Sequence, residues 1–185
     1  MRLTLVTCAV AMVLASAAQA KTTSAQAIAT FKEKYPKYAG EFSKAHGYAV
    51  FPTVGKGAVG VGGAHGSGDV YERGHIIGHT TLTQVTVGFQ LGGQAYSEFI
   101  FFHDKTALDD FTKGQFELDA QASAVALTAG ASGDMPYRKG IAIVTMAKGG
   151  LMYEASVGGQ KFSYKPAVSA GGCSTAVAVL MVAAG

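Results

Sequence analysis

The sequence is poor in tryptophan, proline, cysteine and charged residues. Its 185 residues include no tryptophan, four prolines and two cysteines, and charged residues make up only 15%. The net charge of +3 is too small for a protein that binds nucleic acid by neutralising phosphates. Glycine (25 residues) and hydrophobic residues (49%) are abundant instead. This composition is typical of a folded, weakly charged, β-rich protein and excludes disorder as the main state.

The first twenty residues have the parts of a cleavable secretory signal. Met1 and Arg2 form a charged start, residues 3–15 are almost all apolar, and residues 18–20 (Ala-Gln-Ala) give the small-x-small pattern that signal peptidase requires. A membrane anchor is the alternative, but the apolar run is shorter than the ~20 residues of a spanning helix. We therefore expect cleavage after Ala20 and an exported protein, periplasmic or secreted and peripheral to a membrane if it binds one.

Cleavage at this point defines the rest of the chain. Residues 21–166 are long enough for one domain with a real core, and residues 167–185 form an apolar tail of small residues. Cys8 leaves with the signal, so Cys173 in the tail stays without a second cysteine and no internal disulfide can form. The stability of the domain must therefore come from packing.

The beginning of this domain has a helical pattern with a basic character. Apolar and aromatic residues recur at steps of three and four, which places them on one stripe of a helix: Ile28, Phe31, Tyr35, Tyr38, Phe42 and Ala45. Pro36 lacks a backbone N–H, so the pattern predicts two helices, over Ser24–Lys34 and Pro36–Ala45. Lys32, Lys37 and Lys44 fall off the stripe. Residues 21–56 contain six lysines and two glutamates, whereas the remainder of the mature chain sums to −2.

Two interpretations of this basic amphipathic segment remain open. Its apolar stripe can lie in a bilayer interface while the flanking lysines meet anionic headgroups. Alternatively, the stripe docks onto a sheet, which needs a cover on one face. The regular aromatic spacing favours docking on the residues alone.

From Tyr48 the apolar period changes to two. Glycines punctuate strand-like runs over residues 48–52, 57–65, 69–73, 76–91 and 94–103, and a second β region runs over 116–164. Asp104 is a good N-cap for a short helix that Gly114 would end. The sequence therefore predicts an α+β domain, in which two N-terminal helices pack on a twisted antiparallel sheet, barrel-like or sandwich, with one short central helix.

Two glycine patterns within the predicted sheet lead to further expectations. Ala58, Gly60, Gly62 and Ala64 share one strand face, so a helix, a second sheet or a ligand should approach that backbone closely. The segment 91–97 (LGGQAYS) returns as 157–163 (VGGQKFS), and each Gly-Gly pair could form the two-residue turn of a hairpin.

Motifs that carry chemistry are weak. Residues 55–60 spell GxGxxG, but a strand rather than a helix is expected there, so a dinucleotide has no helix N-terminus to bind. His75 and His79 would lie about 13 Å apart on a strand, too far to share a metal ion. No GxSxG, SxxK or HExxH motif is present, and the adjacent carboxylates Asp109 and Asp110 diverge on a short helix. We expect no enzyme, no metal site and no cofactor.

Longer motifs resemble the SYLF-domain family, whose members include exported single-domain bacterial proteins. The resemblance covers about residues 30–165 and is carried by 47–52 (GYAVFP), 56–57, 62–63, 66–71, 82–84, 88–90, 92–102 and 146–151 (MAKGGL). It stops near Pro166, and the tail has no counterpart in the family.

The resemblance implies a function and a set of binding residues. It implies binding of anionic lipids, phosphoinositides in eukaryotic members, with actin binding in some and no enzymatic activity. Carried over, the lipid-binding candidates are Lys32, Lys34, Lys37 and Lys44, with Lys56 and Lys148 in lysine-glycine motifs and Ile28 and Phe31 as apolar contacts. The alternative function is a structural or protein-interaction module of the cell envelope, or a secreted effector.

Overall fold

The computed structural model describes residues 22–114, 117–118, 125–126, 134–135, 137–157 and 159–167. The expected signal over residues 1–20 and the tail from residue 168, with Cys173, lie outside the described residues, so both stay predictions. The elements follow the predicted order, helices first and then the sheet. They are α1 (Ser24–Lys34), η1 (Pro36–Tyr38), α2 (Glu41–Lys44), β1 (Gly47–Glu72), β2 (His75–Phe102), α3 (Lys105–Thr112), β3 (Glu117–Leu118), β4 (Val125–Ala126), β5 (Ile141–Val157) and β6 (Gln160–Pro166). The α+β class is confirmed.

The sheet is built around one very long hairpin. β1 and β2, of 26 and 28 residues, pair antiparallel from Gly47–Phe102 to Glu72–His75. Their two-residue turn has positive φ at Arg73 (48°) and Gly74 (84°), the geometry that a tight hairpin needs. The five predicted strands of this region are therefore two. The hairpin predicted at Gly92-Gly93 is wrong, because both glycines lie inside β2.

The second predicted Gly-Gly hairpin, between β5 and β6, is also wrong. β5 pairs with β2 over residues 87–102 and β6 pairs with β2 over residues 78–84, both antiparallel. The two strands therefore follow each other along the same edge of β2. Outside them lie short strands, with β3 antiparallel to β6 and β4 parallel to β5.

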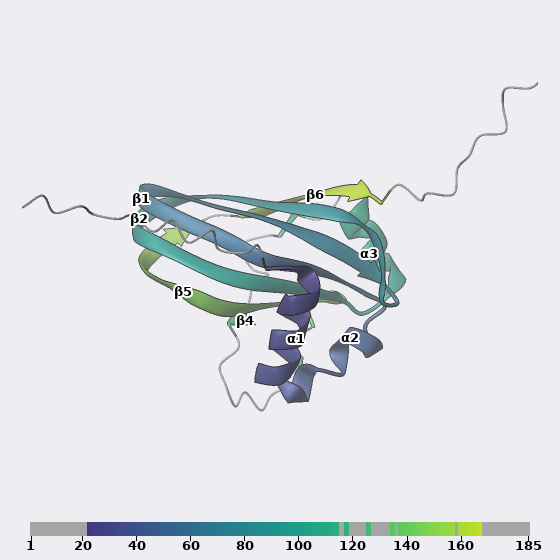
Figure 1. The fold of residues 1–185 in the computed structure, drawn as a ribbon. Helices are drawn as coiled ribbons and strands as arrows, with labels where there is room; N and C mark the ends of the chain where they lie inside the picture. The colour runs from purple at the N-terminus through teal and green to yellow at the C-terminus, as the bar shows by residue number, and fades with distance from the viewer. Residues whose placement is uncertain are drawn as a thin grey trace, which may run out of the picture.

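The long strands bend so that the sheet folds over itself into two layers, which are joined at the left of Figure 1. Within β1, a Cβ on Gly68 would lie 2.2 Å from the carbonyl oxygen of Val50, and one on Gly66 would lie 2.8 Å from Val54 Cγ2. This close approach is made by the other half of the same strand, and it lies at Gly66 and Gly68, beyond the small-residue face predicted over residues 58–64. A β-bulge between Val59 and Val61 lies at the bend. The sheet is open, and its layers give the sandwich-like form of the prediction.

Two hydrophobic cores result. One lies between the N-terminal helices and the sheet, and the other lies between the two sheet layers, where α3 closes the right-hand end in Figure 1. The predicted cap of α3 is confirmed, because the Asp104 side chain accepts from the backbone N–H of Ala107. The predicted helix over residues 36–45 is instead two short turns separated at Ala39–Gly40. Tyr38 and Phe42 both lie in the first core, as the predicted stripe required.

Candidate functional site

The predicted amphipathic stripe is a packing face. Thr23 caps α1 in a reciprocal capping box with Gln26, which fixes where the helix begins. Phe31 is 0% exposed and its ring lies 4.6 Å from that of Phe99 on β2, between ring centroids. Ile28 is partly buried against the same core. The docking interpretation is therefore the one that this conformation adopts, and Phe31 has no surface with which to contact lipid.

Polar contacts also hold α1 to the sheet. The hydroxyl of Ser24, in the first turn of α1, donates to a carboxylate oxygen of Asp69 on β1. The other oxygen of Asp69 lies 2.8 Å from Nδ1 of His79 on β2. The carboxylate thus lies at the positive end of the helix dipole, where an anion is favourable. Helix and sheet form one packed unit through these contacts.

Four lysines lie on the solvent side of this unit: Lys32, Lys34, Lys37 and Lys44. We call them the helical lysines. All four are exposed and come from α1, η1 and α2. Lys32 Nζ lies 5.2 Å from the ring centroid of Phe42, and Lys44 Nζ lies 3.3 Å from Glu41 Oε1. The ammonium of Lys37 likewise lies 6.0 Å from the ring centroid of Tyr38. Four cations against Glu33 and Glu41 leave this layer basic.

The two lysines of the lysine-glycine motifs lie elsewhere. Lys148 on β5 donates to the hydroxyl oxygens of Thr22, at 3.0 Å, and Thr53, at 2.9 Å. Desolvation lowers the pKa of Lys148 below its ordinary value. Lys56 is half-buried on β1 and pairs in register with Gln94. The structure therefore places Lys148 beside the start of α1, whereas Lys56 lies toward the bend.

Sequence reasoning missed two features. Glu98 is fully buried in β2, and its Oε1 has no partner among the residues that the structure describes. A lone carboxylate inside the apolar run Tyr96–Phe102 is the signal that could have found it. The second feature is a set of exposed aliphatic side chains at the bend. Its signal is that residues 74–97 contain no lysine, arginine, aspartate or glutamate.

The candidate chemistry of other motifs is not supported by their placement. The GxGxxG of residues 55–60 lies within β1, as expected, with no helix beginning there. His75 and His79 both lie on β2, and in the described part of the chain no three His, Cys, Asp or Glu side chains gather as metal ligands do. Asp109 on α3 pairs with Lys105 at 2.7 Å. Of these residues, His79 and Asp109 thus have structural partners, Asp69 and Lys105.

Fold and surface together define a class of protein: a small α+β domain whose basic helical layer covers a folded-over sheet. The family model described as "Ysc84: Las17-binding protein actin regulator" matches residues 83–170. The chain is also 30% identical, over 123 residues, to Beta cell expansion factor A of Aeromonas veronii; the match takes in 65% of this chain and 46% of that protein. The chain thus spans about half the length of this relative.

The matched part of the chain, residues 83–170, belongs to the Ysc84 (SYLF) domain family. This family is associated with lipid and actin binding, and its domains are generally non-catalytic binding modules. Among the described helices, none has the length and apolar character needed to cross a bilayer.

Proposed function

We propose that this protein is exported and binds anionic phospholipid surfaces without catalysis, through the phosphate-bearing headgroups. The observation that carries the proposal is the gathering of four exposed lysines on the helical layer of a lipid-associated domain. Each lysine near an anionic surface contributes about 1 kcal/mol, which falls with ionic strength. Since Phe31 is buried and Ile28 is partly buried, α1 contributes charge rather than apolar insertion while it stays docked.

Lys148 and Lys56 have a smaller part in this proposal. Both threonine contacts of Lys148 compete with a headgroup for its ammonium protons, and its lowered pKa reflects partial removal from water. Phosphate is a stronger acceptor than a hydroxyl, so a headgroup that reaches Lys148 would replace these contacts. The helical lysines are therefore the principal site.

The test is co-sedimentation of the exported protein with phosphatidylglycerol-containing and pure phosphatidylcholine vesicles at low and high salt. We expect capture by anionic vesicles at low salt, reduced at high salt. Replacing the helical lysines by glutamine should abolish most of it. A matched control removes four other exposed lysines, Lys105, Lys113, Lys139 and Lys165. Equal capture by both kinds of vesicle, or equal losses in both variants, would contradict the proposal.

A protein partner is the second candidate, and the description of the matching family as a Las17-binding actin regulator favours it. The same basic layer could then meet an acidic protein surface. If the helical-lysine variant loses no vesicle binding but loses binding to a purified acidic partner such as actin, the protein-interaction function replaces the lipid-binding one.

A further inference from the structure

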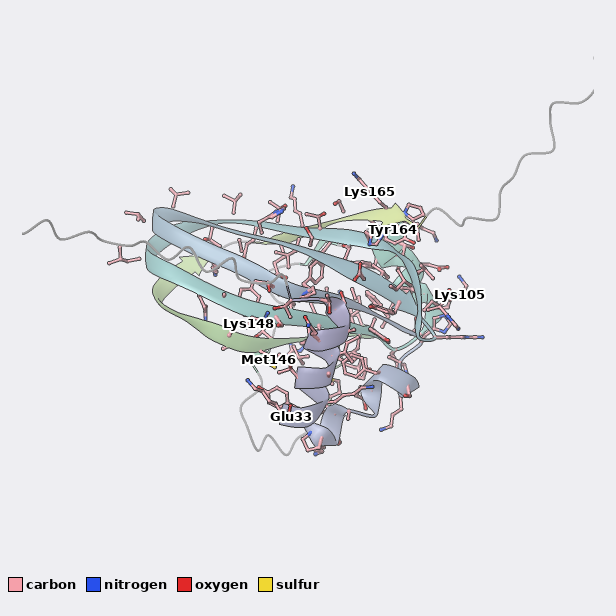
Figure 2. The ribbon with its side chains drawn as sticks, in the orientation of Figure 1. Glu33, Lys105, Met146, Lys148, Tyr164 and Lys165 are labelled. Carbon is pink, nitrogen blue, oxygen red and sulfur yellow. The ribbon has the colours of Figure 1, made fainter. Side chains whose placement is uncertain are left out.

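The bend of the sheet exposes aliphatic side chains that a core would normally bury. Val59 is 84% exposed, Val61 64%, Val85 63% and Leu91 58%. We call these four residues the bend patch. They come from β1 and β2, at the left end of Figure 1, where the two sheet layers join. Figure 2 shows side chains projecting away from the sheet at this end.

The four side chains form one surface. Val59 pairs directly with Leu91, and Val61 pairs with Val87, two positions from Val85. Directly opposed residues on neighbouring strands have Cβ atoms about 5 Å apart, and diagonal neighbours are about 7–8 Å apart. Exposed glycines flank them, including Gly57, Gly63 and Gly93. The aliphatic groups therefore protrude from nearly bare backbone.

Charged residues are few on the strands of the bend patch, and the described charged side chain that shares its face is basic. Residues 53–68 of β1 contain one charged residue, Lys56, and residues 74–97 contain none. On β6, Lys161 is exposed and pairs with Thr83, two positions from Val85. Glu154 of β5 is the acidic residue nearest in register, since it pairs with Gln90, the position next to Leu91. The acidic residues of β1, Asp69 and Glu72, lie toward the hairpin turn.

We propose that the bend patch inserts into the headgroup–acyl boundary of an anionic phospholipid membrane, with Lys161 at the phosphates. This inference rests on the proposed function and adds an apolar anchor on a surface separate from the helical lysines. Aliphatic groups with a basic rim are the composition of surfaces that lie 5–10 Å deep in the interface. Unlike α1, the bend patch is available without any rearrangement of the core.

A second copy of the chain fits this surface less well. A stable protein interface buries about 800 Å² on each partner, far more than four aliphatic side chains offer. In a symmetric dimer the same patch would face itself, which would bring the lysine rims of the two copies together. An anionic bilayer, in contrast, can bury a small apolar patch, and its phosphates attract a neighbouring lysine.

The experiment replaces the four residues by threonine, which keeps β-propensity but adds a hydroxyl to the surface. The control is Ile76→Thr, since Ile76 is also exposed, at 50%, but lies nine positions before Val85 on β2, about 30 Å of extended strand. We expect the four-threonine variant to partition into phosphatidylglycerol-containing vesicles at least about tenfold more weakly, with its salt dependence kept. Ile76→Thr should partition as the unchanged protein does. Circular dichroism checks that both variants are folded.

A second readout locates the patch directly. An environment-sensitive dye is attached to Val61→Cys or, as control, Ile76→Cys, both in a Cys173→Ser background. Vesicles should blue-shift the dye at position 61 and leave position 76 unchanged. If the protein binds anionic vesicles but neither the dye nor the threonine variant responds, the inference is overturned and the lysine-based function stands. If the unchanged protein binds no anionic vesicles, the proposed function itself fails. Self-association that the threonine variant abolishes, with no dye response to lipid, would assign the patch to a second copy.

Discussion

The carboxyl of Glu98 on β2 reaches across the second core to β6, where its Oε2 accepts a hydrogen bond of 3.1 Å from Nε2 of Gln160. Oε1 of Glu98 and Oε1 of Gln160 have no hydrogen-bond partner in the described part of the chain. Burial disfavours the charged carboxylate and raises the pKa of Glu98 to about 7, although the hydrogen bond from Gln160 opposes this. A protonated Glu98 can donate to the free oxygen of Gln160, so the neutral carboxyl satisfies both groups.

Stability should therefore fall with rising pH. The pKa of Glu98 rises from 4.5 to about 7 on folding, so the folded state holds the proton more tightly than the unfolded chain does. The stabilisation is complete below about pH 4.5 and is lost as the pH rises to about 7. At 1.36 kcal/mol per pKa unit the full loss is about 3 kcal/mol, and most of it falls between pH 5 and pH 8. Urea denaturation at pH 5 and pH 8 measures it.

Glu98→Gln removes this titration, because the new amide is neutral and can exchange two hydrogen bonds with Gln160. The variant should gain stability at pH 8 relative to the unchanged protein and little at pH 5. Contributions from other groups are the same in both proteins and cancel in the comparison. The control, Glu33→Gln, changes an exposed carboxylate on α1. An identical pH dependence for Glu98→Gln and the unchanged protein would contradict the assignment.

The close approach inside β1 gives a second prediction. A methyl group on Gly68 would overlap the carbonyl oxygen of Val50 at 2.2 Å and lie 3.0 Å from Phe51 Cδ1, so backbone would have to move. Gly68→Ala should therefore cost about 2 kcal/mol or more in the free energy of unfolding. Gly57→Ala is the matched control, because its Cβ would meet nothing within 4 Å on the same strand. Equal denaturation midpoints for the two variants would mean that the two halves of β1 do not pack as described.

Local chemistry explains which elements the sequence predicted well. The ends of α1 and α3 depend on Thr23, Asp104 and Gly114, whose capping roles follow from neighbours within a few residues. The aromatic stripe likewise predicted a single packing face, because helical periodicity is local. Docking on a sheet and lying in a bilayer differ in what packs against this face. The helix residues themselves cannot distinguish the two.

The course of the sheet could not be predicted in the same way. Gly92 and Gly93 have the composition of a hairpin turn, yet ladder pairing on both edges of β2 keeps them in a continuous strand. The glycines near Gly60, which were expected within a strand over residues 57–65, lie instead where β1 bends. Whether a glycine ends a strand or bends it depends on partners far along the chain. The exposure of the bend patch and the burial of Glu98 both depend on this long-range pairing of strands.

Phe31 distinguishes the two interpretations of α1 by experiment. Its side chain is fully buried and its ring lies within 6.2 Å, between centroids, of those of Tyr35, Phe42, Phe99 and Phe101. Phe31→Ala should therefore cost about 3 to 5 kcal/mol in the free energy of unfolding, from lost contacts and the cavity left behind. Lys32→Ala, at the next position on the exposed face, should change it by no more than about 0.5 kcal/mol.

Vesicle binding, measured on the folded fraction of each variant, should be weakened by Lys32→Ala and not by Phe31→Ala, the reverse of their effects on stability. Lys32→Ala removes one of the four helical cations and should weaken anionic capture severalfold at low salt, since each lysine contributes about 1 kcal/mol. Phe31→Ala keeps all four and should bind as the unchanged protein does. If Phe31→Ala instead kept its stability and lost its binding, α1 would have to leave the sheet to act. Its aromatic stripe would then be a membrane-binding face rather than part of the core.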